Sequence, residues 1–220
     1  MIAVITVAIA PVVALMSFFY LKDQFQEPIH LIVRSFILGA ILVFPIMFIQ
    51  YALSNEGVFM NHFLESFIQV AFLEEFFKWF IFMFAMYYHD EFDDHYDGIV
   101  YAVAISLGFA SVENILYLLT NGVEYGFSRA LFPVSSHALF AVIMGYYFRK
   151  AKLSESHTNF NRALAFFIPF TLHGIYNFIL QALETSWTYY LVPFMTALWI
   201  FGLHRMKIAN QATRPREIKT

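Results

Sequence analysis

Seven apolar stretches of about 20 residues are the feature of this sequence that most constrains its fold. A helix that crosses a lipid bilayer needs roughly 20 mostly apolar residues, and these stretches occupy Ile2–Leu21, Leu31–Leu53, Phe63–Tyr88, Gly98–Leu119, Arg129–Phe148, Ala163–Leu183 and Tyr189–Met206. Hydrophobic residues make up 60% of the chain and charged residues 13%, against about 45–50% and about 25% in soluble domains. The sequence therefore predicts an all-α, polytopic membrane bundle in residues 1–206, followed by a short basic tail at 207–220.

The distribution of Lys and Arg predicts which way the bundle faces. Successive connections between seven helices lie on opposite sides of the membrane, and short cytoplasmic connections carry an excess of Lys and Arg. One side receives Lys22, the basic cluster at 149–152, Arg162 and the basic tail, whereas the other side receives little beyond Arg129. We therefore expect a multi-pass protein of the cell membrane with its N-terminus outside and its C-terminus in the cytoplasm.

The composition also excludes several kinds of chemistry and partner. The chain has no cysteine, which excludes disulfides, thiolate metal sites and cysteine nucleophiles. Its net charge of −3 comes without a basic stripe, so nucleic acid is not an expected partner. The lipid bilayer is the partner that the composition predicts, and the oligomeric state is left open.

Three charged residues lie near the centre of the third apolar stretch, where charges are costly. An ionisable group in the middle of a span costs about 2.5–3.5 kcal/mol on insertion scales. Glu74 and Lys78 are spaced i, i+4 and can pair on one helix face. Glu75 points about 100° away, so it needs a further partner, although it can also contact Lys78 at i, i+3. Because an ion pair that only packs helices does not require two adjacent carboxylates, we interpret this group as functional.

Polar residues also interrupt three later stretches. The fourth stretch contains Glu113 and Asn114, the fifth contains His137, and the sixth contains His173 and Asn177 at i, i+4 spacing. Glu113 and Asn114 taken alone are equally typical of an interhelical hydrogen bond. At 1.5 Å rise per residue, the acids and histidines of these four stretches lie roughly 9–17 Å from the external ends of their helices. Similar depths predict that they line one cavity in the outer half of the membrane.

The remaining polar residues need no special explanation at this stage. Asp97 and Gly98 stand at the start of the fourth stretch, where a carboxylate suits a helix cap. Histidines such as His89 and His95 fall in the connections between stretches. These residues are therefore left out of the candidate site.

The cluster predicts hydrolysis of an amide by an activated water. A buried carboxylate beside another acid can act as a base near neutral pH, a neighbouring histidine can share that role, and a second histidine with Asn177 can hold an oxyanion. A serine mechanism through Ser135 or Ser136 near His137 stays open, but no specific activating arrangement favours it. Glutamate and histidine are also zinc ligands. Because the HExxH signature is absent, a reaction without a metal cofactor is favoured over a zinc site.

The order and spacing of these residues resemble the PrsW family of membrane proteases. The resemblance rests on Glu74-Glu75-x-x-Lys78, Phe109-x-x-x-Glu113 and His173-x-x-x-Asn177, and it covers the whole chain, including residues 96–101 and His137. That family is distantly similar to the CAAX-prenyl proteases and the bacteriocin-processing proteins. Where the CAAX proteases have Phe-x-x-x-His, this chain has Glu113, so the partner that activates water is either Glu113 or His137.

The resemblance implies a function that spacing cannot show. PrsW proteases make the first, site-1 cut in a single-span anti-sigma factor on its extracytoplasmic side, and later proteolysis releases a sigma factor under envelope stress. By motif, Glu74, Glu75 and His173 are the leading catalytic residues. The supporting residues are then Lys78, Asn114 and Asn177. A single-span anti-sigma factor is the expected partner, and a prenylated substrate is not implied.

Two other functions use the same residues differently. A proton-coupled transporter or channel would use the buried carboxylates as a relay, but the sequence shows no inverted repeat and no pair of broken half-helices. A non-catalytic scaffold would keep its function in every glutamate and histidine mutant. The protease hypothesis predicts instead that Glu75→Ala or His173→Ala leaves a folded, inserted protein that cleaves nothing.

Overall fold

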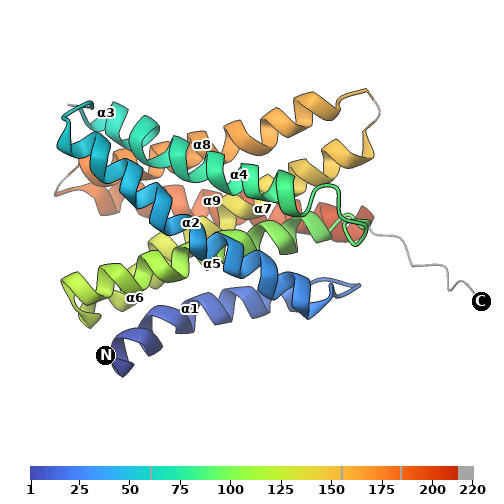
Figure 1. Ribbon diagram of the computed structural model, residues 1–220, viewed down its shortest axis with the longest axis horizontal. Helices are drawn as coiled ribbons and strands as arrows, with labels where there is room; N and C mark the ends of the chain where they lie inside the picture. Colours follow the sequence, from blue (N-terminus) through green and yellow to red (C-terminus); the bar gives the residue numbers. More distant parts are fainter. Residues whose placement is uncertain (60, 155, 184, 213–220) are drawn as a thin grey trace, which may run out of the picture.

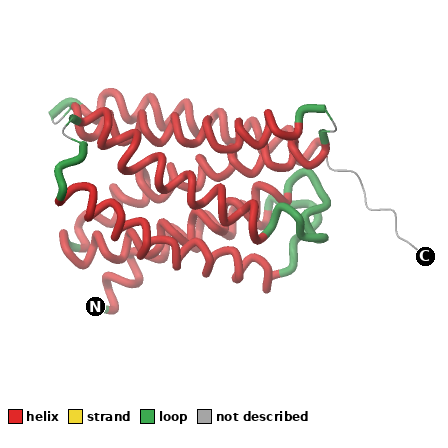
Figure 2. Tube along the Cα trace, turned by 45° about the horizontal axis from the view of Figure 1, so that its top comes forward, coloured by secondary structure: helices red, strands yellow, loops and turns green. Residues whose placement is uncertain are grey.

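The computed structural model describes residues 1–59, 61–154, 156–183 and 185–212, and helices lie side by side along its long axis (Figure 1). Figure 2 shows the loops gathered at the two ends of the bundle and no strand among these residues. The elements are α1 (Ile2–Leu21), α2 (Ile29–Asn55), α3 (His62–Leu64), η1 (Glu65–Phe72), α4 (Leu73–Ala85), α5 (Asp97–Asn121), η2 (Val123–Tyr125), α6 (Gly126–Arg129), η3 (Ala130–Val134), α7 (Ser135–Leu153), α8 (Thr158–Ala182) and α9 (Trp187–Ala212).

Several of these elements follow one another without a break and make up seven helical rods in the described residues. The third rod joins α3, η1 and α4, and the fifth joins η2, α6, η3 and α7. Five of the rods are long and apolar enough to cross a membrane: α1, α2, α5, the rod at Val123–Leu153, and α8. The prediction of an all-α polytopic bundle is confirmed.

The ends of the rods differ from the predicted stretches by a few residues. The fifth rod begins at Val123 rather than Arg129, because the polar turn at its start is already helical. The last helix continues to Ala212, so the first part of the predicted tail, 207–212, extends α9. Residues 213–220 of that tail lie outside the described residues.

The two central helices, α5 and α7, are buried along most of their length, whereas most residues of α1, α2 and α8 are at least partly exposed. Many exposed residues of the outer helices are large and apolar, as a lipid-facing surface requires. The central helices approach closely at Gly98 and Gly145, where a Cβ on Gly98 would lie 2.4 Å from the Gly145 carbonyl oxygen. Small residues permit such close backbone packing within membranes.

The two ends of the bundle carry different chain segments. The N-terminus and the connections after α2, α5 and α8 lie at the end drawn on the left of Figure 1, and the connections after α1, α4 and α7 lie at the other end. Lys22, Arg149 and Lys152 belong to the second end, which the distribution of basic residues predicts to be cytoplasmic. The up-and-down order of the rods agrees with that prediction.

Three buried acidic residues meet at this second end, and one of them corrects a prediction. Asp97 does not cap α5, because the carboxylate accepts hydrogen bonds from the backbone N–H groups of Asp93 and Asp94 in the preceding loop. One carboxylate oxygen from each of Asp23, Glu27 and Asp97 lies within 4.8 Å of the others. Asp97 therefore belongs to an acidic cluster that ties two loops to the start of α5.

Candidate active site

The acidic residues of the third rod lie directly after a π-helical segment. The π-helix η1 ends at Phe72, and α4 then carries Glu74, Glu75 and Lys78, each at most 6% exposed. The Lys78 ammonium donates to Glu75 Oε1 at 2.9 Å and lies 3.4 Å from Glu74 Oε2. π-Helical turns change the direction in which later side chains point and are frequent at functional sites. One lysine thus forms ion pairs with both carboxylates.

The two histidines reach the acidic residues from α7 and α8. His173 Nδ1 lies 2.9 Å from Glu75 Oε1, and His137 Nδ1 lies 3.1 Å from the Lys78 ammonium. The two imidazole rings meet edge to face at 5.2 Å between centroids. A second π-helical segment, η3, ends three residues before His137 and contains Pro133. The predicted meeting of acids and imidazoles from separate helices is therefore present in the structure.

The proton of His137 can be placed from its neighbours. A lysine ammonium only donates hydrogen bonds, so His137 Nδ1 accepts from Lys78. The ring proton then sits on Nε2, which donates to Glu113 Oε2 at 3.0 Å. Both ring nitrogens of His137 are thus engaged, and the imidazole connects Lys78 to Glu113.

Arg129 completes the network at the end of α5. Its Nη2 donates to Glu113 Oε1 at 3.0 Å, and its Nε donates to Asn114 Oδ1 at 2.7 Å. The Asn114 amide in turn donates to the carbonyl oxygen of Ala8 on α1, at 3.0 Å. Asn114 therefore acts as an interhelical link, and Glu113 is an ion-paired acid that orients His137.

A cavity of about 620 Å³ reaches this network from the side. Glu74 and Glu113 both line it, whereas Glu75, His137 and His173 are not among its lining residues. Glu74 also lies 3.4 Å from the Gln50 amide nitrogen on α2. Of the two adjacent acids, Glu74 is thus the one that faces space for a substrate, and Glu75 is enclosed by Lys78 and His173.

Two predicted groups behave differently from this cluster. Asn177 lies one turn after His173 on α8, and its buried amide nitrogen has no hydrogen-bond partner among the described residues. Ser136 donates to the Pro133 carbonyl oxygen at 2.8 Å, and Ser135 donates to that of Leu131. Because both hydroxyls bond within their own helix, the structure does not favour the serine mechanism.

Comparison with known proteins identifies the family. The model of a family described as PrsW family intramembrane metalloprotease matches residues 27–201. The chain belongs to the PrsW family. It is 61% identical over 213 residues to a protein of Oceanobacillus iheyensis named Protease PrsW, which covers 97% of this chain and 99% of that protein. A Bacillus subtilis protein of the same name is 54% identical over 212 residues, covering 96% and 97% of the two chains.

More distant relatives agree with this assignment. A Clostridioides difficile protein, also named Protease PrsW, is 31% identical over 212 residues and covers 91% of this chain and 88% of that protein. No solved structure is significantly similar to the chain. The chain is therefore a membrane-embedded, multi-pass protease.

The family description includes a metal, so the donors in the site can be tested for fit. Glu74, Glu75, His137 and His173 each offer one ligand atom within 4.8 Å of the others, and carboxylate and imidazole are suitable zinc ligands. The Lys78 ammonium, however, lies 2.9–3.4 Å from three of these four residues. With Lys78 in this place, the residues do not accommodate a metal cation.

Two residues of the network were missed by sequence reasoning. Arg129 entered the sequence argument only as a charge that helps to set the orientation of the bundle. It is the one Lys or Arg residue in the predicted external connections, and this isolation was a usable signal. Gln50 stands between Ile49 and Tyr51 in an otherwise apolar run, and this isolated amide was a usable signal. Polar groups inside membrane helices usually have such a role.

Proposed function

We propose that this PrsW-family protease makes the first cut in a single-span anti-sigma factor near the outer face of the membrane, by a reaction that needs no metal cofactor. The observation that supports this most is the buried network of Glu74, Glu75, Lys78 and two histidines beside a cavity. Glu74 lies near the middle of its rod, and Glu113 and His173 lie in the parts of α5 and α8 nearer the end that holds the N-terminus. The distribution of basic residues predicts that this end faces outward.

Glu74 is the proposed base. Its carboxylate lines the cavity, and its contacts with Gln50 and Lys78 are both long, at 3.4 Å. A water held there loses a proton to Glu74 while its oxygen bonds to the carbonyl carbon of the peptide. The same proton then passes to the leaving nitrogen as the carbon–nitrogen bond breaks. The products are a new carboxylate end and a new amine end.

Glu75 and Lys78 are proposed to position the reacting groups. Glu75 fixes the His173 ring through Nδ1 at 2.9 Å, which leaves Nε2 of that ring as an acceptor for the second hydrogen of the water. The Lys78 ammonium pairs with both neighbouring acids and holds their side chains in place. Positioning of this kind contributes to catalysis without covalent chemistry.

Asn177 is the proposed donor to the oxyanion. Its amide nitrogen is buried and has no partner among the described residues, and a buried unsatisfied donor costs about 1–3 kcal/mol. A carbonyl oxygen that becomes negative in the transition state would satisfy that donor. Removal of one oxyanion donor typically lowers kcat by about 100- to 1000-fold.

Reconstitution with a candidate single-span anti-sigma factor tests the function. The arms are the unchanged protein, the protein with a chelator, Glu74→Gln, and Glu65→Gln as the matched control on the same rod. Glu65 is half-buried and lines no part of the cavity. We expect cleavage to survive chelation and the control substitution, and to be lost in Glu74→Gln.

The outcomes separate the parts of this proposal. Cleavage lost on chelation and restored by zinc would overturn the metal-free reaction. Full activity of Glu74→Gln would remove Glu74 as the base. Failure of the unchanged protein to cut the anti-sigma factor, while it cuts another single-span protein, would overturn the substrate.

A further inference from the structure

The cavity beside Glu74 is formed by two helices that cross and then diverge. At the crossing of α2 and α5, a Cβ on Gly39 would lie 1.8 Å from the Ile105 carbonyl oxygen, and one on Gly108 would lie 2.0 Å from that of Phe36. Figure 1 shows α2 passing over α5 near the middle of the bundle and separating from it toward the N-terminal end. The crossing is therefore fixed, and the space opens beyond it.

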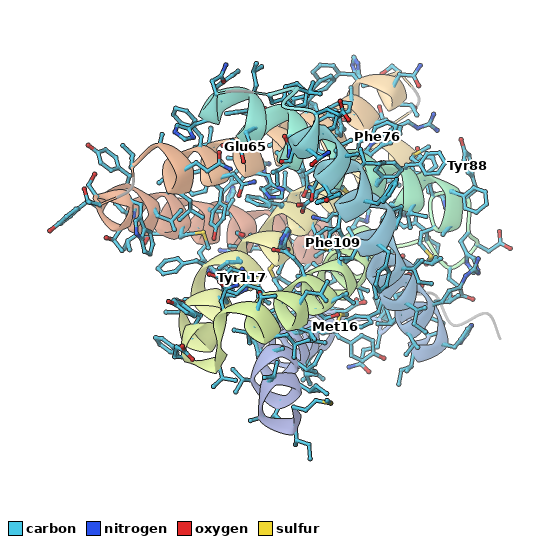
Figure 3. All side chains as sticks on the ribbon, turned by 60° about the vertical axis from the view of Figure 1, so that its left-hand side comes forward. Met16, Glu65, Phe76, Tyr88, Phe109 and Tyr117 are labelled. Atoms are coloured by element: carbon cyan, nitrogen blue, oxygen red, sulfur yellow. The ribbon has the colours of Figure 1, made fainter. Side chains whose placement is uncertain are left out.

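This cavity, which we call the wedge, has mainly apolar walls. The residues that line it come from α2, the third rod and α5, and comprise Met47, Gln50, Val70, Glu74, Phe109, Glu113, Leu116, Tyr117, Leu119 and Thr120. In Figure 3, Phe109 lies near the middle of the molecule and Tyr117 lies closer to its edge. Met47 is 41% exposed and Leu119 is 55% exposed, so the walls reach the surface of the bundle.

The charges at the wedge are all of one sign. Glu74 and Glu113 line it, and no Lys, Arg or His is among its lining residues. The cations that neutralise these acids, Lys78 and Arg129, contact them without lining the wedge. An acidic group brought into the wedge would lose its water beside two carboxylates and meet no cation there, which is a strong means of rejecting a ligand.

We propose that this wedge between α2 and α5 receives the substrate sideways, as an extended apolar segment next to its membrane span, and excludes acidic residues beside the bond that is cut. The inference rests on the proposed protease function and adds the route and the selectivity. An apolar segment matches Met47, Val70 and Leu116, and its carbonyl groups come to Glu74 at the inner end. The cavity volume is within the range of ordinary ligand sites, about 300–1,000 Å³.

Labelling of single cysteines tests the route, because the chain has no cysteine of its own. Met47→Cys places a thiol on the wedge, and Phe48→Cys places one on the adjacent residue, which is 72% exposed and does not line the wedge. After reaction with a bulky maleimide, we expect Met47→Cys to lose cleavage by at least about tenfold, or about 1.4 kcal/mol. The cleavage rate of labelled Phe48→Cys should stay within about twofold of that of its unlabelled form, which corresponds to less than about 0.5 kcal/mol.

The unlabelled proteins separate this proposal from the function on which it rests. If the unchanged protein fails to cut the anti-sigma factor, the proposed function is overturned whatever the variants do. If the unchanged protein and both unlabelled variants cut and labelling of Met47→Cys leaves the rate unchanged, the function stands and the wedge is not the route. Equal loss in both labelled proteins would also overturn the route, because blockage would then not depend on the wedge.

Substrate variants test the selectivity. Each residue flanking the cut bond is changed in turn to Glu, Gln and Lys, and we expect Glu to lower kcat/KM by at least about tenfold relative to Gln, with Lys within about threefold of Gln. A protease carrying Thr120→Lys, which adds a cation to the lining, should recover much of the loss with the Glu substrate. Equal rates for Glu and Gln substrates, or no recovery with Thr120→Lys, would overturn the exclusion of acids.

Discussion

The protein buries two acidic clusters at opposite ends of α5, and they are neutralised in different ways. Glu113 and Asp97 are about 24 Å apart along the helix at 1.5 Å per residue. The cluster around Glu113 contains Lys78 and Arg129, which form ion pairs with its carboxylates. At Asp97, the donors are instead the Tyr101 hydroxyl, which bonds to Glu27, and backbone N–H groups, which bond to Asp97 itself.

This difference decides what each cluster can do. In the first cluster, Lys78 and Arg129 pair with carboxylates beside a cavity, which suits acid–base chemistry on a bound peptide. In the second cluster, burial and then the charge of Asp97 raise the pKa of Glu27 to about 8. That cluster therefore retains a proton at neutral pH and holds two loops against the bundle. Buried acids in a membrane protein are thus not by themselves a sign of catalysis.

The largest expected effect comes from removal of the cation in the first cluster. Lys78→Met leaves Glu74 and Glu75 facing each other without an ammonium, and loss of one partner of a buried pair costs about 3–5 kcal/mol. We expect a large fall in the unfolding temperature in detergent and no cleavage. The double variant Lys78→Met with Glu75→Gln should regain much of the stability but none of the activity. A stable, active Lys78→Met protein would show that the comparison is wrong.

The helical rods and the main residues of the first cluster were largely predictable from the sequence. The apolar stretches give the rods to within a few residues, because length and hydropathy alone define a membrane span. Glu74, Glu75, His137 and His173 were predicted because ionisable groups interrupt apolar runs. Their contacts were not, since those depend on the rotation of each helix, and the π-helical segments before Glu74 and His137 alter that rotation.

The second cluster escaped sequence reasoning for a different reason. Asp23 and Glu27 lie in the loop after α1, and Asp97 lies about 70 residues later at the start of α5, where each looks like an ordinary loop or cap residue. Their meeting depends on how two loops pack over the bundle. Periodicity and hydropathy carry no information about that packing.

Arg129 gives the next largest effect, because it neutralises the acid that orients His137. Arg129→Met removes two hydrogen bonds to Glu113 and Asn114, and bonds to charged groups contribute about 1.5–3 kcal/mol. At 1.36 kcal/mol per tenfold, we expect kcat/KM to fall about 10- to 100-fold. Arg205→Met at the other end of the bundle is the control. An unchanged kcat/KM in Arg129→Met would exclude Glu113 from the working site.

The second cluster predicts a pH dependence of stability in place of a change in activity. The pKa of Glu27 is raised from its ordinary value of 4.5 to about 8, so the folded protein binds this proton more tightly than the unfolded chain does. The stabilisation is complete below about pH 4.5 and is lost as the pH rises through about 8. Glu27→Gln should flatten this decline in thermal unfolding and leave cleavage unchanged. A decline as steep as in the unchanged protein would exclude Glu27 as its source.

The smallest effect is expected at Tyr101, where the loss of stability on substitution should depend on pH. The Tyr101 hydroxyl donates to Glu27, and a neutral hydrogen bond contributes about 0.5–1.5 kcal/mol, whereas one to a charged group contributes about 1.5–3 kcal/mol. Tyr101→Phe should therefore destabilise the protein modestly at pH 6, where Glu27 holds its proton, and more at pH 9, where Glu27 is ionised. Thermal unfolding at the two pH values measures the difference, with Glu27→Gln as the background in which that difference should vanish. An equal effect at both values would mean that Glu27 keeps one charge state throughout, and the two clusters would then differ only in which groups surround their carboxylates.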